Sequence, residues 1–171
     1  GNVAIANAPG AGVADDKAVY PFVPDLVRYY LNEEPLLPNV GTYCLWDPDQ
    51  RAAVLDRLDE LVTKPVDGAG GYGLVIGPKA SDEELADLRA EIEADPRGWI
   101  SQEVVQLSRV PTVTEDGLAG RHVDLRPFII SSADGIEVVP GGLTRVALEK
   151  GSLIVNSSQG GGSKDTWVLR G

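Results

Sequence analysis

The chain has 171 residues, a hydrophobic fraction of 43% and a formal net charge of −11, which suits one domain or two small lobes with a buried core. The negative charge argues against nucleic acid and anionic membranes as partners, and no apolar run could span a bilayer. With one cysteine and one histidine, the chain has neither a disulfide framework nor a His/Cys zinc site. We therefore expect a cytoplasmic protein whose metal, if it uses one, is a hard ion such as Mg²⁺.

The front of the chain reads as a strand, a turn and a helix. Residues 3–6 (VAIA) predict a short buried strand that ends at Asn7, and NAPGAG predicts a turn. The acidic pair before Lys17 predicts the cap of a helix that runs from about Lys17 to Leu31, with Pro21 in its first turns. A loop of turn-forming residues then leads to a strand predicted over Thr42–Trp46.

Two further helices carry clear start signals. Asp47 followed by Pro48 predicts an N-cap and first helical position, and the apolar stripe comprises Val54, Leu55, Leu58 and Leu61. Ser81 and Glu84 form an S-x-x-E capping box, and the stripe of this helix comprises Leu85, Leu88 and Ile92. Asp95-Pro96 ends the second of these helices.

A glycine-rich hairpin is predicted between these helices, from Leu61 to Gly77 (LVTKPVDGAGGYGLVIG). The first strand ends near Lys64, and the second spans 74–76. Glycines at 68, 70, 71 and 73 allow positive φ and close approach, and free N–H groups in such a loop can hold an anion. An ordinary hairpin with a flexible tip fits the same pattern.

The second half of the chain predicts mainly strands. We expect strands over Trp99–Val105, Leu143–Leu148 and Ser152–Val155, and a hairpin of 123–131 with 135–139 that turns at 133–135. The segment 107–121 is polar and turn-rich and predicts a soft domain boundary, and the tail from Asn156 begins as a second glycine-rich loop. This order of elements indicates an α+β fold.

Taken in order, these motifs resemble the ATP-grasp superfamily of carboxylate–amine ligases. The resembling pieces are Asp16-Lys17, L-P-x-V-x-T-Y from Leu37, Lys64 in KP, the glycine hairpin, ISQEVV from Ile100, DLRPFII, GGLTRVA and VNSSQGGG. They cover nearly the whole chain.

The closer likeness is to the circularly permuted group related to glutathionylspermidine synthase-like proteins. In ordinary ATP-grasp enzymes an E-x-N-x-x-P-G metal strand closes the domain, whereas VAIANAPG stands here before the DK lysine. Ile5 occupies the glutamate position, so that Asn7 alone remains as a metal ligand candidate. We expect a fragment of a longer protein with an incomplete metal site.

The resemblance implies two lobes, built from antiparallel or mixed sheets with flanking helices, and a nucleotide cleft between them. Residues 1–38 would be a permuted strand and helix of the larger lobe, 39–106 the small lobe, and 107–171 part of the larger lobe.

It also implies roles for particular residues. Lys17 and Lys64 would contact the α- and β-phosphates of ATP, and the loop with Gly68, Gly70, Gly71 and Gly73 would close over them as a lid. Gln102, Glu103 and Val105 would lie on the strand that holds adenine. Solvated lysines and a plain strand are the alternative interpretations.

Arg126 and Arg145 would bind the γ-phosphate and a developing acyl phosphate, since a guanidinium binds both oxygens of such a group. The alternative is that each arginine pairs with a carboxylate such as Asp124 or Glu137, and Asp124 lies on the same face of the strand as Arg126. Asn156 would belong to a second anion-binding loop, or to a flexible linker.

The function implied is the ATP-binding domain of a ligase that joins a carboxylate to an amine through an acyl phosphate, with Mg²⁺ and with an amino acid or peptide as substrate. The alternative is a nucleotide-binding or catalytically silent fragment without its full metal site; a purely structural domain would also suit the composition. Homo-oligomers are expected where missing flanking sequence leaves apolar surface uncovered.

Overall fold

A computed structural model of the chain describes residues 2–3, 10–68, 70–156 and 160–169. The chain divides into two compact units, Gly1–Val105 and Gln106–Gly171, which are described separately below. The predicted strand over 3–6 and the metal-ligand candidate Asn7 lie largely or wholly outside the described residues. Residues 10–38, which we assigned to the larger lobe, fall within the first unit. Their assignment to a lobe stays a prediction.

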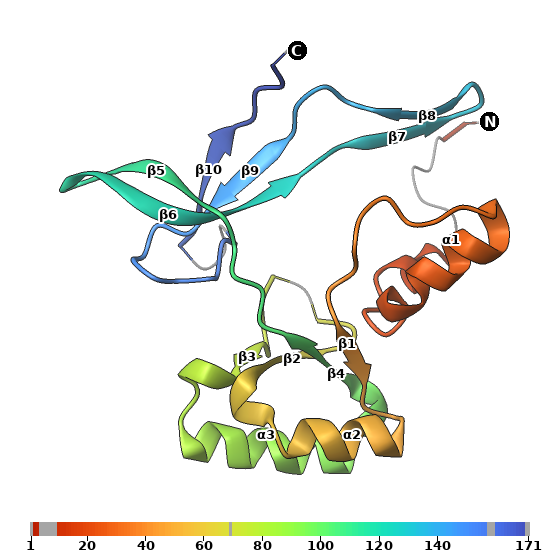
Figure 1. Cartoon of the computed structure of the whole chain (residues 1–171), viewed down its shortest axis with the longest axis vertical. Coiled ribbons are helices and arrows are strands. Elements are labelled where there is room, and N and C mark those ends of the chain that lie inside the picture. The colour runs from red at the N-terminus through yellow and green to blue at the C-terminus, as the bar shows by residue number, and fades with distance from the viewer. Residues whose placement is uncertain (1, 4–9, 69, 157–159, 170–171) are drawn as a thin grey trace. The chain divides into compact units, whose positions relative to one another are not determined.

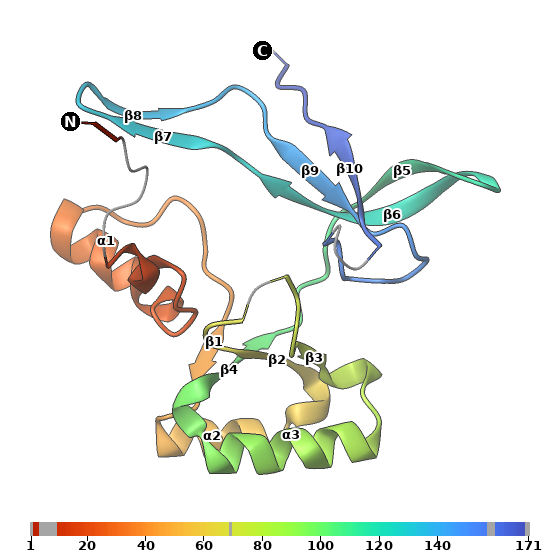
Figure 2. The same cartoon turned by 180° about the vertical axis from the view of Figure 1, so that it is seen from behind.

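The first unit is built on a four-stranded antiparallel sheet in the order β1-β4-β2-β3. The strands are β1 (Thr42–Cys44), β2 (Leu61–Pro65), β3 (Val75–Ile76) and β4 (Trp99–Glu103). The helices α2 (Pro48–Leu55) and α3 (Asp82–Ala94) cover one face of this sheet (Figures 1 and 2). Both start signals are confirmed: the Asp47 carboxylate accepts from the N–H groups of Asp49 and Gln50, and Ser81 and Glu84 form a reciprocal capping box.

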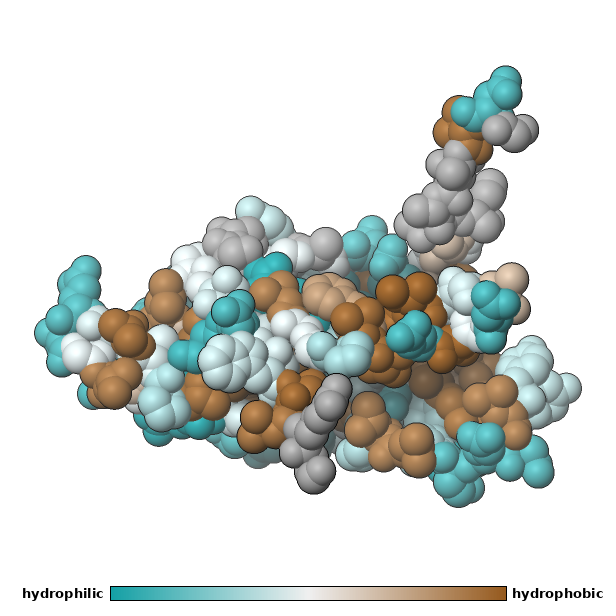
Figure 3. Space-filling model, turned by 90° about the horizontal axis from the view of Figure 1, so that it is seen from above, coloured by the Kyte–Doolittle hydropathy of each residue, from teal (hydrophilic) through white to brown (hydrophobic). Residues whose placement is uncertain are grey.

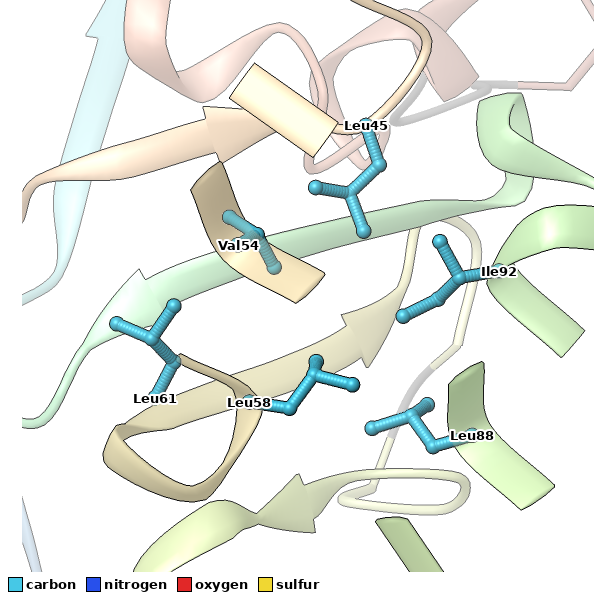
Figure 4. Close-up of a cluster of buried hydrophobic side chains, with 6 residues drawn as sticks. All are labelled: Leu45, Val54, Leu58, Leu61, Leu88 and Ile92. Carbon is cyan, nitrogen blue, oxygen red and sulfur yellow. The ribbon is translucent and has the colours of Figure 1, made fainter. Parts of the chain in front are cut away.

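The core of the first unit lies between this sheet face and the two helices. Its buried members come from α2, α3, the turn after β1, the β2 strand and the 3₁₀ turn before it: Leu45, Val54, Leu58, Leu61, Leu88 and Ile92 (Figure 4). The predicted stripe of α2 does not lie on one helix, because α2 ends at Leu55 and Leu61 begins β2. Leu58 in the 3₁₀ turn and Leu61 in β2 still lie in the core.

The predicted helix over Lys17–Leu31 is wrong in its first half. Two 3₁₀ helices (Ala11–Ala14 and Tyr20–Phe22) precede α1, which begins only at Val23 and ends at Leu31. Pro21 and Pro24 explain the late start, because proline has no N–H to donate and is tolerated only in a first helical turn. Lys17 therefore lies in a turn rather than on a helix.

The second unit contains a four-stranded antiparallel sheet in the order β10-β9-β6-β5. Its strands are β5 (Arg109–Thr114), β6 (Gly117–Arg126), β9 (Leu143–Val146) and β10 (Gly162–Asp165); β7 (Ile129–Ser132) and β8 (Gly135–Val138) form a separate hairpin. The hairpin predicted at 133–135 is confirmed for β7 and β8. The α+β class with antiparallel sheets is thus confirmed.

The segment 107–121 consists mostly of the paired strands β5 and β6, whose β-branched residues favour an extended chain. The two units divide just before it, between Val105 and Gln106. One strand prediction in the second unit is wrong. No strand forms over Ser152–Val155, where the Ser152 hydroxyl accepts from the Ile154 N–H at 3.1 Å and closes a local turn instead. The tail, predicted to begin as a glycine-rich loop, goes on to form β10, which pairs with β9.

The β7–β8 hairpin carries large hydrophobic side chains that face solvent. Ile129, Ile130, Ile136 and Val138 are all more than half exposed. Figure 3 shows exposed hydrophobic residues (brown) among polar ones (teal) on the surface of the chain. A two-stranded hairpin is at best marginally stable by itself in water. Among the described residues, no helix has the length and apolar character to cross a membrane.

Candidate functional site

A pocket of about 650 Å³ lies in the first unit, on the sheet face that α2 and α3 leave uncovered. Strand alternation explains its composition. Lys64 lies opposite Ile100 in the β2–β4 register, and Gln102 follows two positions later on the same face. The residues between them, Thr63 and Ser101, face the other way, and their hydroxyls share a buried hydrogen bond of 2.7 Å. The sheet thus presents the polar side chains of Lys64 and Gln102 on one face and its core on the other.

The segment from Val13 to Val23 forms the other wall of the pocket. Lys17 holds this segment to the sheet: its backbone N–H donates to the Val66 carbonyl at 3.1 Å, and its ammonium donates to the Val66 and Gly68 carbonyls. Ala18 packs in a small buried cluster with Val66 and Ile100. The structure therefore brings Lys17 and Lys64, which are 47 positions apart in the printed sequence, into one pocket.

Burial and a neighbouring charge act on the Lys64 ammonium. Burial, and in second place the positive charge of Lys17, lowers the pKa of Lys64. The Lys64 ammonium donates to Oε1 of Gln102, whose Nε2 donates in turn to the Thr42 hydroxyl at 2.8 Å. A half-buried pair of cations favours an anion between or beside them, since an anion offsets both the repulsion and the lost hydration.

The glycine loop begins where Lys17 contacts the chain. A Cβ at Gly68 would lie 2.6 Å from Cγ of Pro65, so only glycine fits this position. Gly70, Gly71 and Gly73 have positive φ, which side chains of L-residues rarely adopt. Tyr72, near the end of the loop, is 69% exposed.

Two other residues predicted to contact adenine lie differently. The Glu103 carboxylate accepts a 2.6 Å hydrogen bond from the Tyr43 hydroxyl and lies 3.5 Å from the Arg57 guanidinium, and the Tyr43 contact raises the pKa of that phenol. Val105 follows the last strand of the first unit and is half exposed. Neither lines the pocket.

The predicted arginines lie together on one face of the second unit's sheet. Arg126 pairs with Asp124 (Nη2–Oδ2 3.1 Å) and donates to Oδ1 of Asn156 at 3.2 Å. Arg145 is placed opposite Asp124 in the β6–β9 register. The carboxylate pairing is thus present for Arg126 and partly neutralises its charge, and binding of a phosphoryl group by Arg126 stays a prediction.

A family model described as "Circularly permuted ATP-grasp type 2" matches residues 1–147. The chain belongs to this family.

Relatives of the ATP-grasp chain extend well beyond it. An uncharacterized protein of Synechocystis sp. is 61% identical over 171 residues, which is all of this chain and 36% of the relative. An uncharacterized protein of Mycobacterium tuberculosis is 59% identical over 99% of this chain and 31% of its own length. A Frankia alni protein with the name "Putative glutamate--cysteine ligase 2-3" is 56% identical over 99% of this chain and 20% of its own length. The chain thus spans about a third or less of these relatives.

The pocket of the ATP-grasp chain also contains residues that the motifs did not single out. Tyr20 lines it and accepts the Val40 N–H at 2.9 Å through its hydroxyl, and Val13, Val19 and Val23 contribute to the same wall. The alternation of β4, which places Ile100 and Gln102 on one face, was the signal that could have found the sheet side. The wall from Val13 to Val23 had no such signal, because the sequence predicted a helix from Lys17 onward where the structure has turns.

A magnesium site is not evident among the described residues, which contain no group of three or more His, Cys, Asp or Glu side chains placed to hold a metal. Asn7, the predicted ligand, is not described. The Mg²⁺ site remains a prediction.

Proposed function

We propose that the pocket of the first unit binds ATP, with Lys17 and Lys64 on its phosphates, as the ATP-binding part of a ligase that joins a carboxylate to an amine. The observation that carries this proposal is the convergence of two distant lysines on one pocket in a chain of the ATP-grasp family. The lowered pKa of Lys64 supports it, because a bound phosphate would place a negative charge next to this ammonium and offset the burial and the repulsion that lower its pKa.

The contacts suggest how each group acts. Lys17 has three N–H donors, of which two go to the Val66 and Gly68 carbonyls, so one can reach a phosphate oxygen. Because the same contacts join Lys17 to the base of the glycine loop, closure of that loop would bring its N–H groups to the phosphates. Gln102 would contact the nucleotide with its side chain.

The reaction proposed for the longer protein consumes one ATP per bond. A carboxylate oxygen attacks the γ-phosphorus, ADP leaves, and the amine nitrogen then attacks the acyl carbon, losing a proton as phosphate departs. Arg126 and Arg145 would stabilise the transferred phosphoryl group across a cleft between two lobes. The Frankia relative's name supports amino acids as substrates, glutamate and cysteine first among them.

ATP binding is tested by a thermal-shift titration with Mg-ATP, since a ligand that binds only the native state raises its stability. A chain whose melting temperature does not respond to Mg-ATP would contradict the proposal.

A second candidate function is a nucleotide-binding part that needs the rest of its protein for turnover. The short share of the relatives that this chain spans favours it. ADP release with pooled amino acids by this chain alone would exclude it. Binding without turnover, together with turnover by the full-length Synechocystis relative, would support it.

A further inference from the structure

The wall of the lysine pocket contains acids that work against an anionic ligand. Asp15 and Asp16 line the pocket together with Lys17 and Lys64, so the formal charges of these four residues cancel. The chain as a whole carries −11 and supplies no attractive field for an anion. An anion site at this position therefore needs a further cation, placed where it offsets one of the two carboxylates.

Arg97 meets that need through an ion pair with Asp16. Its Nη2 donates to Oδ2 of Asp16 at 3.0 Å, an ion pair between residues 81 positions apart. The other carboxylate oxygen of Asp16 accepts the Ala18 N–H at 2.8 Å, which fixes the turn around Lys17. Both oxygens of the Asp16 carboxylate thus accept hydrogen bonds.

The guanidinium of Arg97 is itself held in place. It lies over the Trp46 ring, 5.1 Å from the ring centroid, and Trp46 stacks on Phe22 with centroids 6.4 Å apart. The neighbouring backbone joins the same assembly, because the Val66 N–H donates to the Gly98 carbonyl at 2.8 Å and Val66 accepts from Lys17. A lysine at position 97 would keep the charge but lose both the fork and the stacking geometry.

We propose that Arg97 is a positioning residue for the phosphate pocket that acts through Asp16: its guanidinium neutralises this carboxylate next to Lys17, so that the pocket can accept an anion. This inference rests on the proposed ATP site. Without the guanidinium, Asp16 would turn its full negative charge toward Lys17 and the incoming phosphates. Loss of the guanidinium would therefore weaken the binding of phosphate ligands, and removal of the Asp16 charge would restore it.

The test compares Kd for Mg-ATP and for inorganic tripolyphosphate in the 171-residue chain and four variants. Arg97→Gln should weaken both ligands by about three- to tenfold, as expected for the loss of about 0.7–1.4 kcal/mol. Arg97→Lys should lie between Arg97→Gln and the wild type. Asp16→Asn should bind as well as the wild type or more tightly, and the double variant Asp16→Asn/Arg97→Gln should recover affinity close to the wild type.

Arg89→Gln is the matched control, since it removes the same charge from an exposed position on α3. Recovery in the double variant separates charge neutralisation from a purely structural role, in which the second substitution would not help. The inference is overturned if Arg97→Gln binds like Arg89→Gln, or if the double variant is as weak as Arg97→Gln. A wild-type chain that binds neither ligand would remove the proposed ATP site itself, and the inference with it.

Discussion

Replacing Lys64 by methionine should separate ligand binding from stability. Lys64 lies on the pocket face of β2, and burial together with the charge of Lys17 disfavours its ammonium. Methionine keeps the unbranched chain and removes the charge. We therefore expect weaker ATP binding without a lower melting temperature, because the substitution relieves a half-buried charge, and Gln102 keeps its bond to Thr42.

The size of the binding effect follows from the contact that is lost. A hydrogen bond to a charged group contributes about 1.5–3 kcal/mol, and about 1.4 kcal/mol corresponds to tenfold in affinity. Lys64→Met should therefore raise Kd for Mg-ATP by about 10- to 150-fold. At about 100 times the wild-type Kd, ATP stabilises the native state by about 2.7 kcal/mol, and a 100-fold weaker variant would gain only about 0.4 kcal/mol.

The assay is a thermal-shift titration of the wild type, Lys64→Met and Lys79→Met. Lys79 is an exposed lysine of the same unit, so its variant controls for the change in net charge. The reasoning is refuted if Lys64→Met shows the same shift with ATP as Lys79→Met. It is also refuted if the unliganded variant melts well below the wild type, because loss of binding would then report loss of the fold.

Four further predictions follow, two from the lowered pKa of Lys64 and two from helix α3. Because the pKa of Lys64 is lowered, its ammonium loses its proton as the pH rises, at a pH below the ordinary lysine pKa of 10.5. ATP affinity should therefore decline as the pH rises through that range, and Lys64→Arg should abolish the decline. Between the lowered pKa and 10.5 the unfolded chain binds more protons than the native one, so the stability of the unliganded protein should rise with pH, and the difference between wild type and Lys64→Met should follow this rise. Ser81→Ala removes the N-cap of α3 and should cost about 1 kcal/mol in urea unfolding with an unchanged m-value; a change below about 0.3 kcal/mol would contradict the capping box. Ile92→Ala opens a cavity in the core and should cost about 2–5 kcal/mol, whereas Glu93→Ala on the exposed side of the same helix should cost little.

Local signals in the sequence predicted those elements that depend on neighbouring residues. Asp47 and Ser81 each supply a side chain that caps a helix within three residues, so the starts of α2 and α3 were readable without any tertiary contact. The β7–β8 turn is likewise local. The predicted strand at Ser152–Val155 is wrong because strand formation depends on a partner: β10 in the tail pairs with β9, whereas Ser152–Val155 closes a local turn.

The candidate site divides in the same way. The order of motifs along the chain is enough to indicate the ATP-grasp family and to single out Lys17, Lys64 and Gln102. The Asp124–Arg126 pair was also foreseeable, since residues two apart on a strand share a face. The sequence did not show that Glu103 accepts a hydrogen bond from Tyr43 and pairs with Arg57, because these residues belong to segments distant from it along the chain.

What the sequence determined by itself is the chemistry that the chain carries: its cations, its glycines and its capping residues, each set by the residue type and its near neighbours. Only the tertiary structure decided which of these groups meet. The Lys17 turn contacts Val66 and Arg97, and Lys64 reaches Gln102 through the pairing of β2 with β4. Such contacts between segments far apart in the chain depend on strand register and packing, which no local pattern of residues specifies.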